Sequence, residues 1–434
     1  MSETFEVVII GGGPGGYVCA IRSAQLGFKT ACIESKNTLG GTCLNVGCIP
    51  SKSLLNLSEN FNKVKKNFSN LGITTGKVTL NLSKMMKTKE KSVTVLTKGI
   101  EFLFKKNKVT YIKGQASFKS NNEIIVQEKN SQKIYRANHI IISTGSEPTS
   151  LPGIKIDEKI IVSSTGALSF DKVPKELVII GGGYIGLEVA AIINNLGLQV
   201  TIVEMASRIL ERVTSETISS FYTKVHRQAG VEVLTNTSVE GLSEHNNGIE
   251  VITSNGGIIS DFVIVGIGVL PCDTLASESG IEVNNGIIVD EFCRTSNDSV
   301  FSAGDCTMHP NIFYNKNIRL ESVHNAIEQG KTVASSIMGE KISYNQVPWF
   351  WSDQYQTKLQ IVGLLDNYDD IVVRGDTEKQ SFAVFYTKDN AIIASDCVNR
   401  PAEHMMSRKL ISEKVLIDKD RLSDDTIPIK EIVN

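Results

Sequence analysis

The sequence predicts an α/β protein in which two similar parallel-sheet domains are joined by a smaller C-terminal α+β domain. Three observations support this prediction. A glycine-rich motif lies between an apolar run and a helix-like stretch twice, beginning at Gly11 and at Gly181. The chain has 434 residues, which is enough for several domains with buried cores. Residues 343–434 instead show short apolar strands, followed by a helical stretch near residues 401–415.

The two copies of the motif agree in detail. Each reads G-x-G-x-x-G, and each continues through a helix-like stretch into a second apolar run that ends in an acid. The acid is Glu34 in the first copy and Glu204 in the second, and each stands 18 residues after the last glycine of its motif. The motif glycines are Gly11, Gly13 and Gly16 in the first copy, and Gly181, Gly183 and Gly186 in the second.

Each position of this pattern has a physical role in binding a dinucleotide. The first glycine permits a tight strand-to-helix turn, the second lets the backbone approach a pyrophosphate, and the third lets the helix pack on the strand. The helix N-terminus offers unpaired N–H groups to the phosphates, and the acid accepts hydrogen bonds from ribose hydroxyls. A single copy could be only a turn, but two copies with matched acids predict two Rossmann-like dinucleotide-binding domains.

The second acid bears on the choice of nicotinamide coenzyme. A 2′-phosphate would meet the carboxylate of Glu204, so the sequence favours NAD over NADP. Arg208 stands close enough in the chain to keep NADP open.

Two different dinucleotides in one chain suggest a division into three domains. Residues 1–150 and 271–342 are predicted to form one dinucleotide-binding domain, because the later segment looks like a return to the first sheet. Residues 151–270 are predicted to form a second dinucleotide-binding domain, and residues 343–434 a separate α+β domain.

Composition excludes several classes of protein. Lys and Arg number 45 and Asp and Glu number 47, so the formal net charge of −2 argues against nucleic acid as a partner. No run of about 18 apolar residues is present, so no membrane span is expected. The N-terminal residues carry acid where a signal peptide needs base, so a cytoplasmic location is expected.

Two of the eight cysteines stand apart from the others. Cys43 and Cys48 lie in the segment GGTCLNVGCIPSK (residues 40–52), with four residues between them. At a distorted helix start they could close a disulfide, and the helix N-terminus would favour a thiolate. The alternatives are two inert cysteines or half of a metal site; no further ligands stand at zinc spacing, so no metal is expected.

The first half of the chain, from residue 5 to about 190, resembles the flavin-dependent pyridine nucleotide–disulfide oxidoreductases, and most of all their dihydrolipoamide dehydrogenase branch. Residues 40–52, 143–146 and 163–168 carry the resemblance. It implies that Cys48 faces the flavin, that Cys43 exchanges with substrate, and that Lys52 lies near flavin N5 and pairs with Glu188. A surface lysine is the alternative for Lys52.

From about residue 185 the chain is similar to the NADH-dependent ferredoxin reductases of the putidaredoxin- and rubredoxin-reductase type. The segments that carry this likeness include residues 304–306, 321–326 and 348–354. It implies that Asp305 holds the FAD ribityl chain, that Val323 lies beside the flavin edge, and that Trp351, with Trp349, shields the ring. A turn residue is the alternative for Asp305, and core packing is the alternative for the tryptophans.

Together the motifs and the two resemblances imply that residues 1–150 and 271–342 form an FAD-binding domain, that residues 151–270 form an NAD-binding domain, and that residues 343–434 form a C-terminal α+β interface or reductase domain. They also imply the following site residues. The catalytic residues are Cys43, Cys48, Lys52 and Glu188. The FAD-binding residues are Gly11, Gly13, Pro14, Gly16, Glu34, Gly41, Thr42, Lys52, Gly114, Thr144, Gly145, Asp305, Val323 and Trp351. The NAD-binding residues are Gly181, Gly183, Tyr184, Ile185, Gly186, Glu188, Glu204 and Gly268.

These implications lead to an FAD-dependent NADH oxidoreductase, and the sequence leaves three alternatives for where its electrons go. The first is a small iron–sulfur protein, because the C-terminal segment decides which acceptor reaches the flavin. The second is a disulfide substrate, as in dihydrolipoyl dehydrogenase, although the His-Pro-Thr segment that carries the usual C-terminal base is missing and His404 is the only histidine in the last domain. The third is oxygen, in a flavoprotein that turns over only slowly. The two branches differ in oligomeric state, so a homodimer is expected from one of them only.

Overall fold

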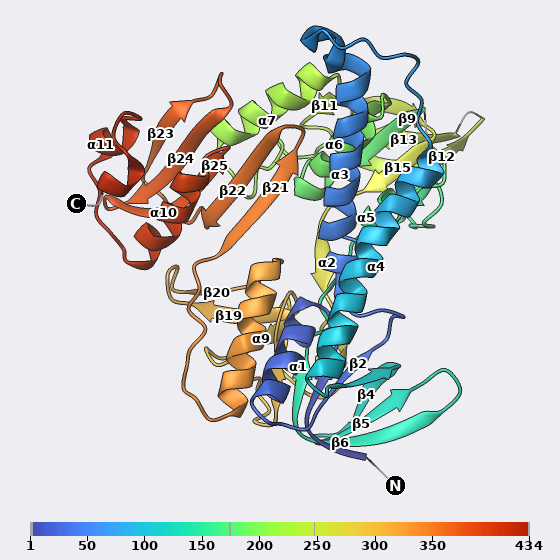
Figure 1. Ribbon diagram of the computed structural model, residues 1–434, viewed down its shortest axis with the longest axis vertical. Coiled ribbons are helices and arrows are strands. Elements are labelled where there is room, and N and C mark those ends of the chain that lie inside the picture. Colours follow the sequence, from blue (N-terminus) through green and yellow to red (C-terminus); the bar gives the residue numbers. More distant parts are fainter. Residues whose placement is uncertain (1–2, 173–174, 247, 433–434) are drawn as a thin grey trace. The chain divides into compact units, whose positions relative to one another are not determined.

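The computed structural model describes residues 3–172, 175–246 and 248–432, which fold into two compact units (Figure 1). Unit 1 comprises Met1–Ile49, Lys91–Glu147 and Val269–Pro348, and unit 2 comprises Pro50–Glu90, Pro148–Gly268 and Trp349–Asn434. The helices α3 (Cys48–Asn62) and α4 (Leu82–Lys106) contribute residues to both units. The finer division into three domains stays a prediction.

Unit 1 is built on a seven-stranded sheet in the order β3-β2-β1-β6-β5-β4, in which β18 also pairs with β6. Strands β1, β2, β3, β6 and β18 are parallel, and β4 and β5 extend the sheet in antiparallel fashion. The strands are β1 (Glu3–Ile10), β2 (Thr30–Glu34), β3 (Thr110–Lys113), β4 (Gln115–Ser120), β5 (Glu123–Gln127), β6 (Gln132–Ile142) and β18 (Val300–Ser302).

The central strand β1 is buried on both faces, which explains its continuous apolar run. Val8 and Ile10 pack into one hydrophobic core of unit 1, whereas Val7 and Ile9 pack into another. Helices α1 and α9 lie together over the sheet (Figure 1). The other elements of this part are α1 (Pro14–Gln25), α2 (Gly41–Asn45), α8 (Thr274–Ser277), α9 (Val323–Ile337), the pair β7 (Ser146–Pro148) and β16 (Val269–Pro271), and a small sheet of β17 (Ile287–Ile288), β19 (Thr307–Asn311) and β20 (Lys316–Ile318).

Unit 2 contains a second parallel sheet, in the order β11-β10-β9-β15-β8, and an antiparallel three-stranded sheet of β12, β13 and β14. The strands are β8 (Ile161–Val162), β9 (Glu176–Ile180), β10 (Gln199–Val203), β11 (Glu232–Leu234), β12 (Val239–His245), β13 (Gly248–Thr253), β14 (Gly256–Ser260) and β15 (Phe262–Val265). The helices and short helical turns beside them are α5 (Ser164–Ala167), α6 (Tyr184–Asn195), α7 (Glu216–Ala229), η1 (Lys63–Asn67) and η2 (Phe68–Leu71).

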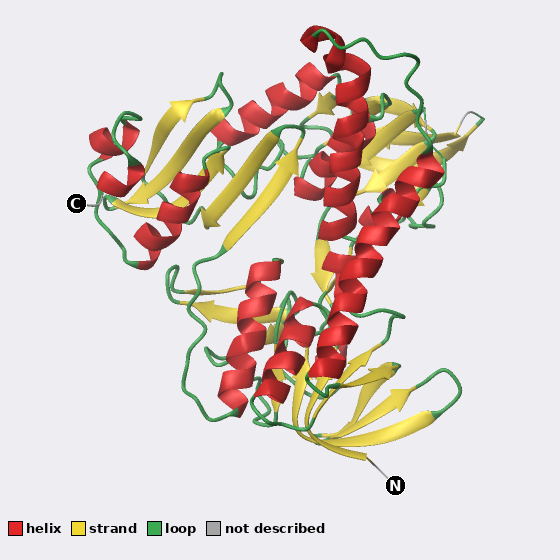
Figure 2. Cartoon of the chain, in the orientation of Figure 1, coloured by secondary structure: helices red, strands yellow, loops and turns green. Residues whose placement is uncertain are grey.

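The C-terminal part of unit 2 is a five-stranded antiparallel sheet in the order β21-β22-β25-β24-β23 (Figure 2). Its helix begins at Pro401, where the sequence predicts one. The parallel strands of the first two sheets, together with this antiparallel sheet, confirm the predicted fold class. The elements are β21 (Trp349–Gln354), β22 (Thr357–Gly363), β23 (Asp370–Asp376), β24 (Ser381–Lys388), β25 (Ala391–Val398), α10 (Pro401–Ser412), α11 (Lys419–Ser423) and η3 (Ile429–Glu431).

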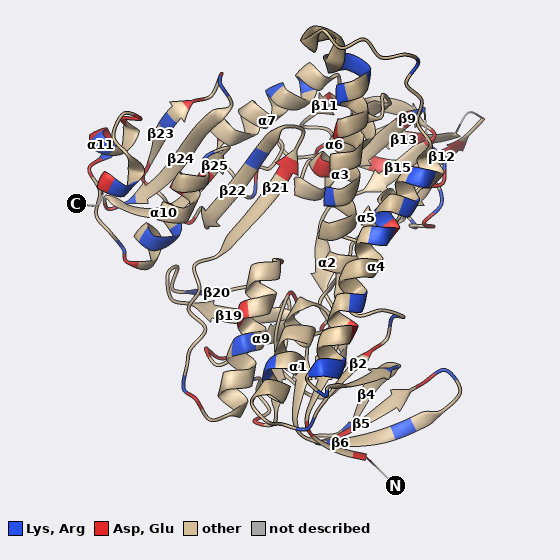
Figure 3. Cartoon of the chain, in the orientation of Figure 1, with Lys and Arg blue, Asp and Glu red and all other residues tan. Residues whose placement is uncertain are grey.

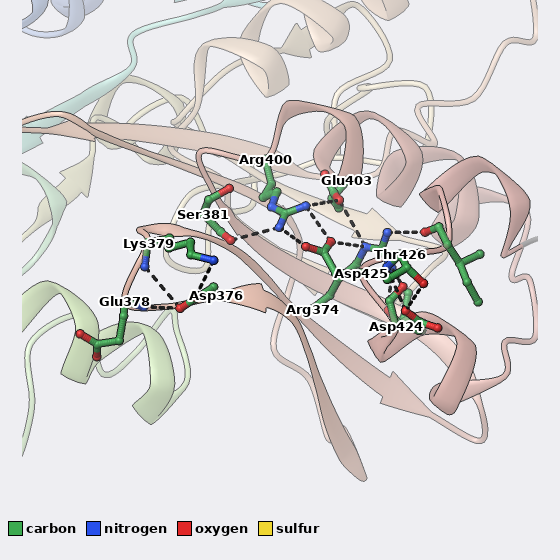
Figure 4. A network of polar contacts seen from close by, with 12 residues as sticks. Arg374, Asp376, Glu378, Lys379, Ser381, Arg400, Glu403, Asp424, Asp425 and Thr426 are labelled. Atoms are coloured by element: carbon green, nitrogen blue, oxygen red, sulfur yellow. Dashed lines mark hydrogen bonds and ion pairs between the residues drawn. The ribbon is translucent and has the colours of Figure 1, made fainter.

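A buried arginine holds the end of the chain onto this sheet. Arg374 of β23 donates to the backbone carbonyls of Leu422, Asp424 and Ile427, and it forms an ion pair with Glu403 of α10 at 3.3 Å (Figure 4). The tail therefore depends on one guanidinium group for several of its polar contacts.

A buried carboxyl group joins the same sheet to α7 within unit 2. Asp396 of β25 is 1% exposed and accepts a hydrogen bond from Tyr386, whose hydroxyl lies 2.9 Å from Ser215 Oγ at the start of α7. Burial raises the pKa of Asp396 to about 7 from its ordinary value of 3.8. The folded protein thus keeps this carboxyl protonated at pH values where the unfolded chain releases the proton.

This difference predicts a pH-dependent loss of stability. Between pH 4 and pH 7 the unfolded state loses the proton of Asp396 first, so the residue's contribution to stability falls by about 3 kcal/mol as the pH rises. Asp396→Asn should remove that slope. Burial lowers the pKa of His226 to about 4, so the contribution of His226 to stability rises with pH and opposes that of Asp396. The contribution of His226 is the same in the variant and in the wild type. The quantity to measure is therefore the difference between their free energies of unfolding in urea, at pH 5 and at pH 7.5. An equal difference at both pH values would contradict the prediction.

Across residues 3–172, 175–246 and 248–432, every helix is too short or too polar to span a bilayer.

Candidate functional site

The first glycine motif forms the turn between β1 and α1. Gly11 has a φ of +107°, and a Cβ atom there would lie 2.1 Å from the carbonyl oxygen of Ser143. A Cβ on Gly16 would lie 1.8 Å from the carbonyl oxygen of Gly11, so both positions require glycine. Gly13, directly before Pro14 at the start of α1, has room for a Cβ, because its nearest neighbour is an atom 3.7 Å away.

The second motif repeats this geometry between β9 and α6. Gly181 also has a φ of +107°, and a Cβ on Gly186 would lie 2.3 Å from the carbonyl oxygen of Gly181. A Cβ on Gly183 would meet no atom within 4 Å. Tyr184 opens α6, and Ile185 follows it with 43% of its surface exposed. In both turns the second glycine is therefore not required by the protein's own packing.

The two acids at the strand ends are positioned in the same way. Glu34 accepts hydrogen bonds from the backbone N–H groups of Gly12 (2.8 Å) and Lys36 (2.8 Å). Glu204 accepts them from Gly182 (2.7 Å) and Ala206 (2.8 Å). Each carboxylate is thus fixed beside the glycine turn of its own motif.

Arg208 is the residue that leaves NADP as a possible coenzyme in the sequence analysis. In the structure its guanidinium binds other residues of the chain. Its guanidinium donates to the carbonyl oxygens of Thr214 and Glu211 and to Ser219 Oγ. Gly268, the last predicted residue of this site, has a φ of +117°, and a Cβ there would lie 3.8 Å from Arg212 Nη2.

The two singled-out cysteines differ from five others in exposure. Cys43 lies in α2, directly after Gly41 and Thr42, and Cys48 opens α3; both are half-buried, whereas Cys19, Cys32, Cys293, Cys306 and Cys397 are buried. Burial raises the pKa of Tyr17 to about 12, and the charges of Cys43 and Cys48 add to this rise. Both thiols therefore act electrostatically on one tyrosine of unit 1.

Three further predicted residues lie just after strands β3 and β6. The N–H of Gly114 donates to the carbonyl oxygen of Glu34 at 2.9 Å. Thr144 Oγ1 donates to the carbonyl oxygen of Cys272 at 2.6 Å, and Gly145 has a φ of +74°. The bonds of Gly114 and Thr144 thus hold the backbone where β2 and β6 end.

Asp305 lies three residues after the end of β18 and accepts a hydrogen bond from Ser146 Oγ at 2.8 Å. Burial raises the pKa of Asp305 to about 6, while the bond from Ser146 opposes the rise. Val323 is the first residue of α9, whose N-terminus is capped by Ser322 through the N–H of Asn325.

Sequence reasoning missed Arg319. Its Nη2 atom pairs with Glu321 at 2.8 Å, but its buried Nε and Nη1 atoms have no hydrogen-bond partner among the described residues. Its positive charge also opposes the rise in the pKa of Asp305. The signal in the sequence is a single basic residue two positions before the segment 321–326, which is too weak to single out alone.

The predicted Lys52–Glu188 pair forms within unit 2. Lys52 Nζ lies 2.7 and 2.8 Å from the two carboxylate oxygens of Glu188. The C-terminal strand β21 completes the pair, because Ser352 Oγ and the N–H of Asp353 donate to Glu188 Oε1 at 2.9 and 3.2 Å. Lys52 Nζ also lies 6.0 Å from the ring of Trp351.

A directed chain of hydrogen bonds continues from this pair. Gln354 Nε2 donates to Ser352 Oγ at 3.2 Å, and Gln354 Oε1 lies 2.9 Å from His226 Nε2 of α7. Since an amide oxygen only accepts, His226 carries its proton on Nε2. Ser352 therefore links α7 to Glu188, and sequence reasoning missed it.

We expect Ser352→Ala to weaken this chain. The substitution leaves Gln354 Nε2 and one lone pair of Glu188 without partners in a buried setting, which should lower the free energy of unfolding by about 1–3 kcal/mol. Urea denaturation of the variant measures the change. Ser352→Thr, which keeps the hydroxyl, is the matched control, and equal losses in both variants would show that packing and not the hydrogen bond is responsible.

The tryptophans and His404 form one cluster beside Lys52. The Trp349 and Trp351 ring centroids lie 5.5 Å apart, Arg408 lies 5.4 Å from the Trp349 ring, and His404 lies 5.6 Å from it. Burial, followed by the charges of Arg408 and Lys358, lowers the pKa of His404 to about 4. His404 is therefore uncharged and weakly basic at neutral pH.

The residues present fit two dinucleotides. In unit 1 the open space at Gly13 and the unpartnered N–H groups of Arg319 suit an anionic group, and in unit 2 the open space at Gly183 does the same. Among the described residues, no group of three or more His, Cys, Asp or Glu side chains is arranged to hold a metal ion.

Comparison with known proteins bears out both resemblances. Residues 5–330 match the family model of the pyridine nucleotide-disulphide oxidoreductases, and residues 349–433 match the reductase C-terminal model. The mitochondrial dihydrolipoyl dehydrogenase of Pisum sativum is 42% identical over 360 residues, 80% of this chain and 70% of the relative. The dihydrolipoamide dehydrogenase of Chaetomium thermophilum is 43% identical over 336 residues, 75% of this chain and 67% of the relative.

Solved structures match over nearly the whole chain. The reductase in a covalent putidaredoxin reductase–putidaredoxin complex has a TM-score of 0.81 and 28% identity, covering 99% of this chain and 98% of that one. A ferredoxin reductase from Rhodopseudomonas palustris has a TM-score of 0.80 and 26% identity, covering 100% of both chains. The chain belongs to the pyridine nucleotide-disulphide oxidoreductases, a family of flavin-dependent enzymes that use FAD and NAD(P)H.

Proposed function

We propose that the chain is an NADH-dependent reductase that delivers electrons to a small iron–sulfur protein of the ferredoxin type. FAD would occupy the glycine turn of unit 1 and NADH that of unit 2. When bound, FAD would accept a hydride and release single electrons. The cytoplasmic location stays a prediction.

The observation that carries this proposal is how β21 meets the Lys52–Glu188 pair. Ser352 and Asp353 of the reductase-type segment bind Glu188, and Trp351 lies against Lys52. The segment is thus integrated with the residues that the family resemblance places at the flavin. The related structures named for putidaredoxin and ferredoxin systems support the same kind of acceptor.

Local charge supports an acidic partner. Residues 343–434 contain 11 Lys and Arg against 15 Asp and Glu, so the segment as a whole would not attract an acidic protein. Lys358 and Arg408 are exposed, however, and the charges of both contribute to the lowered pKa of His404, which lies beside Trp349. We propose that these two cations near His404 are the basic patch that an acidic iron–sulfur protein would need.

The contacts of Glu204 and Arg208 support NADH as the electron donor. Glu204 is held beside the second turn, where it would repel a 2′-phosphate. Arg208 is bound to α7 and to its own loop. A comparison of NADH and NADPH as donors should therefore show a clear preference for NADH.

The experiment is NADH-driven reduction of a panel of acidic ferredoxins by the purified protein. Lys358→Glu/Arg408→Glu should slow that reduction by about 10-fold or more at low salt and leave NADH–ferricyanide turnover unchanged. Lys388→Glu/Lys414→Glu, at two other exposed positions of the segment, is the matched control. No ferredoxin turnover above that of free flavin would refute the proposal.

Dihydrolipoyl dehydrogenase activity is the second candidate. The half-exposed Cys43 and Cys48 and the curated relatives favour it. Against it, Glu403, which precedes His404, is bound by Arg374 and Arg400 and does not pair with the histidine. Lipoamide-dependent NADH oxidation that is lost in Cys48→Ser, together with failure on all ferredoxins, would establish this candidate in place of the first.

A further inference from the structure

One stretch of unit 2 concentrates positive charge. Residues 60–89 contain seven lysines and no aspartate or glutamate, although the whole chain has a formal net charge of −2. Two of the seven are paired within the protein, because Lys63 lies 3.7 Å from Glu59 and Lys89 is buried beside Glu90. The other five are exposed and form no ion pair with a described residue; this basic cluster consists of Lys65, Lys66, Lys77, Lys84 and Lys87 (Figure 3).

An ordered turn in the middle of this stretch presents two large apolar side chains to solvent. The N–H of Gly72 donates to the carbonyl oxygen of Ser69 at 3.1 Å, and Gly72 has a φ of +76°. The N–H of Ile73 donates to the carbonyl oxygen of Phe68 at 2.9 Å. These are the two bonds of a Schellman motif, which fixes the backbone where a helix ends. Leu71 and Ile73 are nevertheless 71% and 49% exposed.

Charge and apolar exposure together favour one kind of partner. A solvated surface explains lysines alone, but it does not explain two apolar side chains that a fixed turn holds in water between Lys66 and Lys77. The phosphates of a nucleic acid would bind the lysines and leave Leu71 and Ile73 in water. An anionic bilayer uses both features, because its headgroups attract lysines and its acyl region accepts apolar side chains.

We propose that residues 63–87 of unit 2 bind the surface of an anionic membrane. The basic cluster lies at the lipid headgroups, and Leu71 and Ile73 insert between them. This is a peripheral contact through one turn and its flanks. It uses neither glycine turn and neither member of the Lys52–Glu188 pair, so its test is independent of the electron acceptor.

Co-sedimentation of the FAD-bound full-length protein with lipid vesicles tests the charge. The protein should bind vesicles of phosphatidylcholine that contain about 30% phosphatidylserine, and not vesicles of phosphatidylcholine alone. Each lysine near such a surface contributes about fivefold to binding, so Lys65→Gln/Lys66→Gln should weaken it by about 25-fold. Lys105→Gln/Lys106→Gln is the matched control, because these lysines are also adjacent, exposed and in the last turn of a helix.

A second pair of variants tests the apolar turn. Leu71→Ser should weaken vesicle binding by about 10-fold, since it removes the burial of one leucine side chain, and should leave the melting temperature unchanged. Leu416→Ser is the matched control, because Leu416 is also 71% exposed and lies in the same unit. Tryptophan emission should shift to shorter wavelength on addition of the anionic vesicles in Leu71→Trp and not in Leu416→Trp.

Salt separates the two contributions further. Binding should weaken as ionic strength rises, because the attraction of the lysines is screened, whereas the effect of Leu71→Ser should persist. Absence of binding to the anionic vesicles at low salt would overturn the proposal, and so would equal losses in Lys105→Gln/Lys106→Gln and Lys65→Gln/Lys66→Gln. Lysine-dependent binding that Leu71→Ser does not change, with equally tight binding to duplex DNA, would identify a general polyanion site in place of a membrane contact.

Discussion

Replacing Gly183 with alanine should leave the protein folded and yellow but weaken its binding of NADH by about 100-fold. The added Cβ meets no protein atom within 4 Å, and Gly183 has an extended backbone (φ −81°, ψ 177°) that alanine adopts readily. The only cost is therefore to a ligand that approaches this turn, as a pyrophosphate would. A misplacement of about 1 Å costs an enzyme about 100-fold in rate, and we expect a loss of similar size in NADH affinity here.

The two turns supply matched controls for this prediction. Gly13→Ala should reduce FAD content and spare NADH affinity, because a Cβ there has an ordinary 3.7 Å neighbour and faces the turn of unit 1. Gly186→Ala should instead impair folding, since its Cβ would lie 2.3 Å from a backbone carbonyl oxygen. Titration of NADH against the flavin-loaded variants, with flavin content read from absorbance, separates the three outcomes. Unchanged NADH affinity in Gly183→Ala would show that the second turn is not the coenzyme cradle.

The repeated motif made the two glycine turns predictable because its demands are local. Gly11 and Gly181 need a positive φ, and Gly16 and Gly186 need the absence of a side chain, so the sequence has no other solution at these points. The matched acids followed for the same reason, since strand, turn and helix fall within one supersecondary unit. Local spacing was enough to place these residues.

Other parts of the site depend on contacts that spacing does not reveal. Ser352 binds Glu188 across 164 positions of the chain, and nothing near Ser352 in the sequence indicates that partner. Arg208 illustrates the converse: its proximity to Glu204 suggested a phosphate ligand, but contacts with Thr214 and Ser219 engage its guanidinium. Long-range pairing of this kind is set by how β21 and α7 pack, and a single sequence does not encode it visibly.

Arg374→Met should lower the free energy of unfolding of unit 2 by about 3–5 kcal/mol, the cost of removing one partner from a buried ion pair. Only 3% of the arginine side chain is exposed, and it serves Glu403 together with three backbone carbonyls of the C-terminal tail (Figure 4). Methionine nearly preserves the volume of the aliphatic part, so the loss reports the polar contacts.

The same network offers an internal control. Lys379 lies five residues after Arg374, on the loop after β23. It pairs with Asp376 at 3.5 Å, but its side chain is 81% exposed. Solvent screening leaves such a pair worth at most about 1 kcal/mol, so Lys379→Met should be nearly neutral. Because the carbonyls that Arg374 binds belong to Leu422, Asp424 and Ile427, its loss should also free the tail before the sheet unfolds. Limited proteolysis should then cut Arg374→Met first within residues 413–432, and cleavage at wild-type rates there would mean that apolar packing of Leu422 and Ile429, and not the guanidinium, holds the tail in place.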